Sequence, residues 1–299
     1  MRFLRRASSF LNNMRSDDSG SGVVSKTISF ISGFSLVPII SVGLSLFVIL
    51  IIALVLITTF SYKINLFQFV DLGNSSNVAA GNAIYDVAAL EDYVKSSDEA
   101  YVTGNIPSVD LAGTEYKSVS GFNDYMKKTI CKAGYGTREG VVAAGMSLIG
   151  DYIKATGKRL RYSQGSRQQP GVDGIVNSDF YLDCSGFTCY SLYNGGFNLP
   201  DTGCETGSIY NWAVSNGIAK DPKSGGAGGD FLVTRGKGHI VLIVGSYDGG
   251  YYVAEEDGEE LGGIVQKRSF ENLSTNNYAL VDMSKYYSDS KNVRTDGRC

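Results

Sequence analysis

One cysteine and one histidine in this sequence have the surroundings that thiol chemistry requires. Cys184 lies within "YLDCSGFTCY" (181–190), between Asp183 and Ser185. The single histidine, His239, follows a glycine-rich turn and opens the apolar run "HIVLIVG". The thiolate is the reactive form of cysteine, and it needs a base within hydrogen-bonding reach. The sequence therefore indicates a nucleophile at Cys184 and its base at His239, provided that the fold brings them together.

The segment around Cys184 is predicted to be a helix that begins at Asp183 or Cys184 and ends at 195–196, where two glycines follow each other. Unpaired N–H groups and the dipole at a helix start stabilise negative charge, and so favour a thiolate. Helical patterns also cover 84–94, 137–157 and 204–217.

The last part of the sequence, after Ser224, has the pattern of strands and turns. Apolar runs separated by glycine turns predict strands at 230–234, 239–245, 251–255, 263–270 and 278–283. Such runs are typical of an antiparallel meander. Helices followed by strands indicate the α+β class.

These motifs, in this order, resemble the NlpC-type cell-wall cysteine peptidases. The similar segments are "DCSGF" (183–187), "GDFLV" (229–233), "GHIVLIVG" (238–245), "VVAAGMSLIGDYI" (141–153) with "RYSQG" (161–165), and "NLPDTGCETG" (198–207). The resemblance covers about 138–285. It implies a papain-like domain at 136–288, in which N-terminal helices pack on an antiparallel sheet.

The resemblance also implies roles for individual residues. Cys184 resembles the family nucleophile, and His239 resembles the base that pairs with it. Tyr162, Asp183 and Ser185 match positions that line the substrate cleft in the family. For these three residues, capping or packing is the alternative.

Two segments depart from the family pattern. The turn "YSQGS" (162–166) replaces the family's Trp-Gly-Gly. The polar residue that orients the histidine is often His, Asn or Gln in the family, but the matching strand here reads "YYVAEEDG" (251–258). Strand alternation places Glu255 on the face of Val253, so Glu255 is expected to orient His239. Glu256, Asp257 or a merely solvated acidic turn are the alternatives.

Metal chemistry is disfavoured by one histidine and by the lack of a Cys-x-x-Cys motif, and no cofactor is expected. Five cysteines leave at least one thiol unpaired within the chain. A disulfide between Cys184 and Cys189 is disfavoured, because five residues along a helix turn the side chains about 140° apart. Pairing of Cys189 with Cys204, or of Cys131 with Cys299, stays open.

The N-terminal part predicts a membrane anchor. Residues 27–62 contain no charge, and the core at 36–60 exceeds the roughly 20 apolar residues that a spanning helix needs. The basic segment 1–26 is expected to be cytoplasmic, with 27–61 spanning the membrane and the rest outside. A partly helical stalk is expected at 62–135 and a C-terminal tail at 289–299. A cleaved signal peptide is disfavoured because the apolar segment is too long.

Composition excludes one broad class of function. A charged fraction of 19% and a net charge of −3 do not suggest nucleic-acid binding. The expected function is that of a single-pass, membrane-anchored cysteine peptidase that hydrolyses peptide bonds in peptidoglycan stem peptides outside the cytoplasm. The alternatives are a papain-like amidase or acyltransferase, or a catalytically weak wall-binding module of a secretion or conjugation apparatus.

Overall fold

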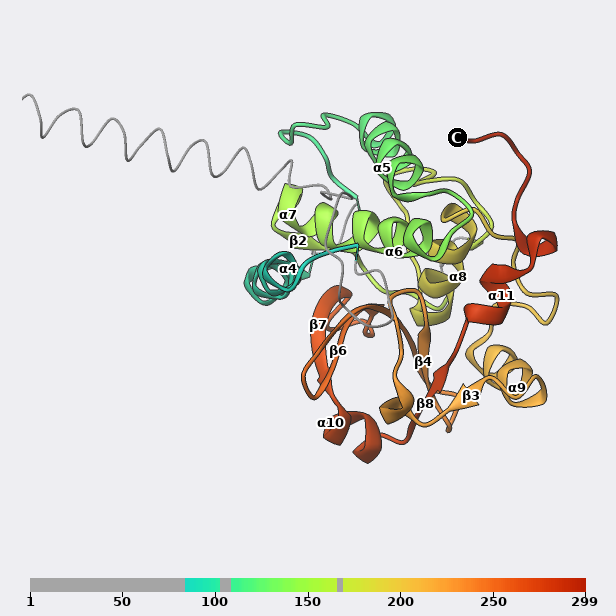
Figure 1. Cartoon of the computed structure of the whole chain (residues 1–299). Helices are drawn as coiled ribbons and strands as arrows, with labels where there is room; N and C mark the ends of the chain where they lie inside the picture. Colours follow the sequence, from blue (N-terminus) through green and yellow to red (C-terminus); the bar gives the residue numbers. More distant parts are fainter. Residues whose placement is uncertain (1–83, 103–108, 166–168) are drawn as a thin grey trace, which may run out of the picture. The chain divides into compact units, whose positions relative to one another are not determined.

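Helices precede an antiparallel sheet along the chain, which is the α+β arrangement that the sequence predicts (Figure 1). The computed structural model describes residues 84–102, 109–165 and 169–299. The predicted anchor at 27–61 lies outside these residues. Among the residues described, no helix is long and apolar enough to cross a membrane.

The helical elements come mainly from the first half of the described chain. They are α4 Val87–Glu99, α5 Val119–Ala133, α6 Arg138–Met146, the π-helical turn η1 Ser147–Asp151, α7 Tyr152–Thr156, α8 Cys184–Asn194, α9 Thr206–Ser215, α10 Phe270–Thr275 and α11 Ser284–Ser288, with the 3₁₀ turns η2 Pro222–Ser224 and η3 Ser290–Asn292. Thr137 caps α6 by accepting a hydrogen bond from the N–H of Gly140. Gly157 ends α7 in the left-handed conformation, with φ 66°. The predicted helix at 137–157 is thus observed as α6, η1 and α7.

The strands form a small pair and a large sheet. They are β1 Tyr101–Val102, β2 Lys158–Arg159, β3 Ala219–Lys220, β4 Phe231–Thr234, β5 Ile240–Tyr247, β6 Gly250–Glu256, β7 Gly263–Ser269 and β8 Tyr278–Val281. The strand order of the large sheet is β3-β8-β4-β5-β6-β7, and all of its pairs are antiparallel. The short β1 pairs with β2 in parallel.

The expectation of a simple meander after Ser224 is correct only for β4 to β7. The strand β8 does not continue beyond β7 but pairs with β4, at the other side of the four strands. The chain must therefore cross a face of the sheet between β7 and β8. The helix α10 makes this crossing, although only strands and turns were expected in this region. Its Leu273 is buried against that face.

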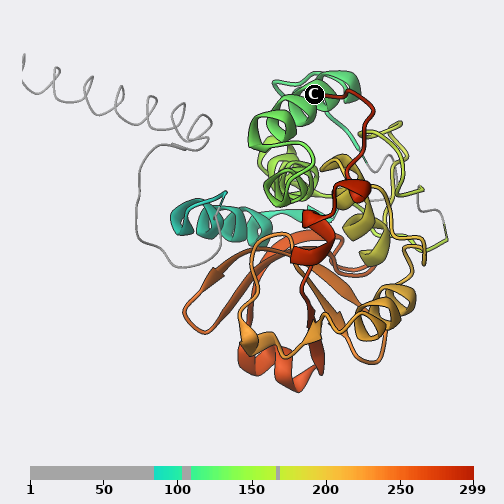
Figure 2. The same cartoon turned by 45° about the vertical axis from the view of Figure 1, so that its right-hand side comes forward.

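The large sheet carries apolar side chains on both faces, because successive residues of a strand point to opposite sides. Leu242 and Ala254 face the helices α6 and α8, in one cluster with Phe187. Val241 and Val253 lie in a second cluster with Leu273 of α10. Figures 1 and 2 show the sheet between these helices, with α6 and α8 on one side and α10 on the other. Consecutive residues at the end of β6 thus lie in two different environments.

The described part of the predicted stalk, at 84–102 and 109–135, is partly helical, and it is not separate from the domain. All described residues belong to one compact unit. Leu90 of α4 and Phe122 and Met126 of α5 are buried in the same cluster as the helix-facing side of the sheet. Leu90 approaches β5 at Gly245, where a Cβ atom would collide with its side chain. The expected boundary between 135 and 136 therefore does not mark an edge of the folded unit.

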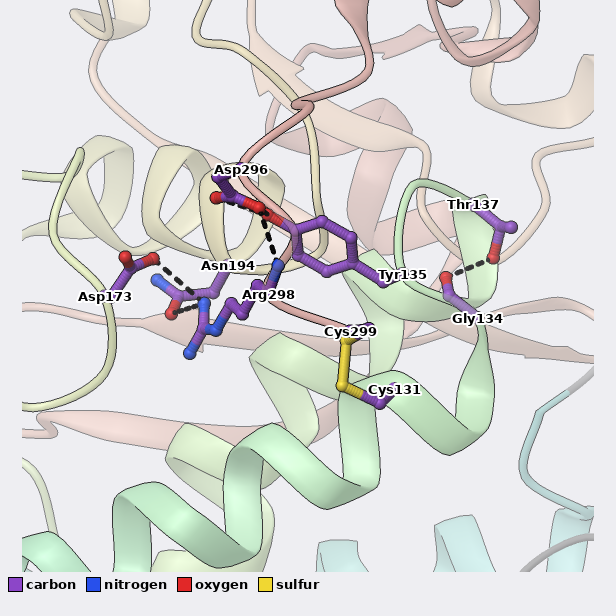
Figure 3. Close-up of a disulfide and its surroundings, with 9 residues drawn as sticks. All are labelled: Cys131, Gly134, Tyr135, Thr137, Asp173, Asn194, Asp296, Arg298 and Cys299. Atoms are coloured by element: carbon purple, nitrogen blue, oxygen red, sulfur yellow. Dashed lines mark hydrogen bonds and ion pairs between the residues drawn. A yellow bond between two sulfur atoms is a disulfide. The ribbon is translucent and has the colours of Figure 1, made fainter.

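Two disulfides fasten distant segments to this unit. Cys131 of α5 is bonded to Cys299, the last residue, and Cys189 of α8 is bonded to Cys204. The same end of the chain is held by Arg298, which donates to Asn194 Oδ1 at 2.8 Å and to an Asp173 carboxylate oxygen at 3.0 Å (Figure 3). The predicted tail at 289–299 is thus bound to the domain.

The remaining cysteine, Cys184, is a free thiol. In denaturant without reductant, thiol alkylation should therefore label Cys184 alone, and after reduction it should label all five cysteines, as peptide mass mapping can show.

Replacing both Cys131 and Cys299 by Ala should lower the free energy of unfolding by about 2–4 kcal/mol, measured by urea unfolding. Labelling at any second cysteine before reduction would contradict this pairing.

Candidate active site

The helix α8 presents Cys184 at its first residue, as predicted. Asp183 caps this helix, since its Oδ1 accepts hydrogen bonds from the N–H of Gly186 at 2.6 Å and from Ser185 Oγ at 3.1 Å. Asp183 and Ser185 are buried. They fix the end of α8 at which unpaired backbone N–H groups lie. Their observed role is capping, and their role in lining a substrate cleft stays a prediction.

The four residues of this region that the sequence singled out lie together. Tyr162 forms a parallel bridge with Leu182, which places it beside the start of α8. Burial, followed by the nearby charge of Cys184, raises the pKa of Tyr162 to about 12. Tyr162 is therefore a neutral phenol at physiological pH. Cys184 is buried, with 4% of the residue exposed.

His239 lies at the turn between β4 and β5, where the backbone is fixed from both sides. Its N–H donates to Thr234 Oγ1 at 3.0 Å, and its carbonyl accepts from the N–H of Thr234 at 3.0 Å. The ring Nε2 lies 2.5 Å from Glu255 Oε2. Since Nε2 is bound by the carboxylate, Nδ1 is the ring nitrogen left to face Cys184. The contact that strand alternation predicted between Glu255 and His239 is confirmed.

The two partners of His239 decide its charge. Burial alone would lower the pKa of the imidazole, but hydrogen bonds with Cys184 and Glu255 raise that pKa to about 10. At neutral pH the ring is therefore an imidazolium. An imidazolium between a thiol and a carboxylate is the charge state that a cysteine nucleophile needs.

Glu255 is a fully buried carboxylate, and each of its two oxygens has two hydrogen-bonding partners. Its Oε1 accepts from Gln266 Nε2 at 2.8 Å and from Arg268 Nε at 2.9 Å, and its Oε2 accepts from Arg268 Nη2 at 2.6 Å. Burial would raise the pKa of Glu255, but the hydrogen bond from His239 and the charge of Arg268 lower it below the usual value. Glu255 is thus ionised and its orientation is fixed.

Two further residues hold Glu255, and neither is among those that the sequence motifs single out. Gln266 and Arg268 lie two residues apart on β7, so they share one face, and β7 pairs with β6. A charged residue predicted to point inward requires a buried partner of opposite charge. The alternation of "GIVQKRSF" could have identified Arg268 on this argument.

Asp257 lies at the edge of the same cluster. One of its oxygens is 3.6 Å from His239 Nε2, and the other is 3.5 Å from Arg268 Nη2. His239, Glu255 and Asp257 are close enough together to hold a metal ion. The donor set does not fit one, because both oxygens of Glu255 accept from the guanidinium of Arg268, whose charge would repel a cation. The cluster fits proton chemistry better.

Glu256 occupies the opposite face of β6 and is also 0% exposed. Among the described residues neither of its carboxyl oxygens has a hydrogen-bond partner. The lack of a side chain at Gly263 makes room for it, since a Cβ atom there would lie 3.0 Å from Oε1. Burial, and then the negative charge of Cys184, raises the pKa of Glu256 well above its usual value. Glu256 is therefore a neutral carboxylic acid, and neither an orienting carboxylate nor part of a solvated turn.

Comparisons of the chain with family models, with curated proteins and with solved structures give no match. The likeness to the NlpC-type peptidases therefore depends on the motifs alone. The function must be argued from the chemistry of Cys184, His239 and Glu255.

The charge of Glu255 should control the reactivity of Cys184. Glu255→Gln is expected to shift the pH–rate profile of Cys184 alkylation by iodoacetamide to higher pH, and Glu255→Ala should shift it further. At pH 7 the rate should fall about 10- to 10²-fold, because a hydrogen bond to a charged group contributes about 1.5–3 kcal/mol. Glu256→Gln is the matched control and should leave the profile in place. Superimposable profiles for Glu255→Gln and the unchanged protein would contradict the assignment.

Glu256 should make the protein less stable as the pH rises. The folded state keeps the Glu256 proton, while the unfolded chain loses it above about pH 4.3, so stability falls by up to about 1.4 kcal/mol for each further pH unit. Glu256→Gln should remove this loss, and urea unfolding at pH 4.5 and 7.5 measures it. Glu91 is the control, because its hydrogen bond with Lys267 lowers its pKa. Glu91→Gln should lower stability by nearly the same amount at both pH values, because both lie above the pKa of an unfolded glutamate. An equal effect of Glu256→Gln at both pH values would argue against a neutral carboxyl.

Proposed function

We propose that this chain is a cysteine peptidase that hydrolyses peptide bonds in peptidoglycan stem peptides. One observation carries the proposal. His239, the only histidine of the chain, contacts the buried carboxylate of Glu255 through Nε2. The same ring forms a hydrogen bond with the thiol of Cys184, the first residue of α8. This is the nucleophile–base–orienting group arrangement of a catalytic triad.

Each residue of the triad has one role in the proposed reaction. The Cys184 thiolate attacks the carbonyl carbon, and the carbonyl electron pair moves to the oxygen. As the intermediate collapses, the imidazolium of His239 gives its proton to the leaving amine, which leaves an acyl thioester. His239 then removes a proton from water, which hydrolyses the thioester. Glu255 keeps the ring oriented and balances its positive charge throughout.

The choice of substrate rests on the motif resemblance to cell-wall peptidases, and the proposed location on two further features. Disulfides persist in oxidising compartments, so the pairs Cys131–Cys299 and Cys189–Cys204 favour an extracytoplasmic domain. The uncharged segment at 27–61 supports a single-pass anchor. We therefore place the proposed peptidase on the outer side of a membrane, where peptidoglycan is accessible.

Incubation of the purified chain with purified muropeptides tests this function. New free amine and carboxyl ends, detected by mass spectrometry, are expected, and Cys184→Ala should reduce their formation by about 10⁴-fold or more. Release of ammonia or transfer of an acyl group would instead indicate an amidase or an acyltransferase. Binding without any product, together with Cys184 alkylation no faster than in the unfolded chain, would overturn the enzymatic proposal in favour of a wall-binding module.

A further inference from the structure

A threonine from another helix borders the sulfur of Cys184. The hydroxyl Oγ1 of Thr206 lies 3.9 Å from Cys184 Sγ. Thr206 is 8% exposed. Among the described residues, Cys184 is the only hydrogen-bonding contact of this hydroxyl. A buried hydroxyl usually has a strong hydrogen-bond partner. Sulfur is a weak partner, so the O–H of Thr206 is available to a stronger acceptor.

The position of Thr206 is fixed by covalent structure. Thr206 is the first residue of α9, and Cys204 lies two residues before it. The disulfide from Cys204 to Cys189 ties this segment to α8, the helix that begins with Cys184. The starts of two helices thus meet at one sulfur atom. No side chain caps α9 at Glu205, so the first-turn N–H groups of α9 add positive potential there.

We propose that the Thr206 hydroxyl is a donor of the oxyanion hole, acting together with the backbone N–H of Cys184. This inference rests on the proposed thiol chemistry. In the tetrahedral intermediate, Sγ and the oxyanion are bonded to the same carbon, so the proposal places the oxyanion on the side of Sγ that the Thr206 hydroxyl borders. The hydroxyl keeps its proton throughout: it hydrogen-bonds the oxygen as negative charge develops and releases it when the carbonyl re-forms.

The neighbouring hydroxyls on α8 are already engaged. Ser185 Oγ donates to Asp183 at 3.1 Å, and Thr188 Oγ1 donates to the carbonyl of Cys184 at 2.9 Å. Both hydroxyls thus form hydrogen bonds within α8 and its N-terminal cap. The hydroxyl of Thr206, in contrast, contacts the sulfur of Cys184 directly.

Two reagents separate the proposed role from an effect on the thiol itself. Acylation of Cys184 by p-nitrophenyl acetate passes through an oxyanion, whereas alkylation by iodoacetamide does not. Both rates are measured on the purified chain without reductant, where Cys184 is the free thiol. The variants are Thr206→Val, which has the same shape without the hydroxyl, and Thr206→Ser, which keeps the hydroxyl. Thr188→Val is the matched control, because it removes a buried hydroxyl that does not face Sγ.

Thr206→Val should slow acylation by about 10²-fold while alkylation keeps its rate and pH profile, since removal of one oxyanion donor costs about 10²–10³-fold. Thr206→Ser should recover most of the loss, and Thr188→Val should leave the ratio of the two rates unchanged. Equal losses in both reactions with a shifted alkylation profile would assign Thr206 to the thiolate and overturn the proposal. An unchanged acylation rate would overturn it as well. A chain that is acylated but hydrolyses no muropeptide would refute the proposed substrate and leave the Thr206 assignment standing.

Discussion

The buried charge of Glu255 is the constraint on which the candidate site depends. An unpaired carboxylate in a protein interior costs several kcal/mol, so this side chain requires its partners on both sides. Arg268 binds it from β7 through two hydrogen bonds, and His239 binds it from the start of β5. The register of three neighbouring strands therefore sets the orientation of the imidazole. The helix α8 then needs only to bring Cys184 to the other side of that ring.

Two adjacent glutamates show how strongly the environment decides the chemistry of a residue type. Glu255 is ionised because a guanidinium and an imidazolium surround it, whereas Glu256 is neutral because it is buried without a hydrogen-bond partner. A neutral acid beside Cys184 adds no negative charge that would oppose a thiolate. The protein thus keeps one carboxylate on the histidine side of the strand and none on the cysteine side. A buried carboxyl without a hydrogen-bond partner lowers the stability of the folded protein. Such local losses of stability are common at functional sites.

Local patterns in the sequence predicted the local parts of this arrangement. The helix start at Cys184, the strand starts near His239 and the face on which Glu255 lies follow from capping, glycine turns and alternation. The parts that depend on distant contacts could not be predicted in the same way. Leu90 packs at Gly245, β8 returns to β4, and Cys131 meets Cys299, and no short pattern encodes such pairings. The local pattern of residues 62–135 therefore predicts a stalk, whereas the structure packs α4 and α5 into the core of the domain.

The titration of the single histidine tests the central claim most directly. Because the chain contains one histidine, its imidazole carbon-bound protons give one assignable set of NMR signals across pH. If His239 is held between Cys184 and Glu255, these signals should not titrate near pH 6.5, and their midpoint should lie near pH 10. A midpoint close to 6.5, the value of a free histidine, would contradict the proposed coupling of thiol, imidazole and carboxylate.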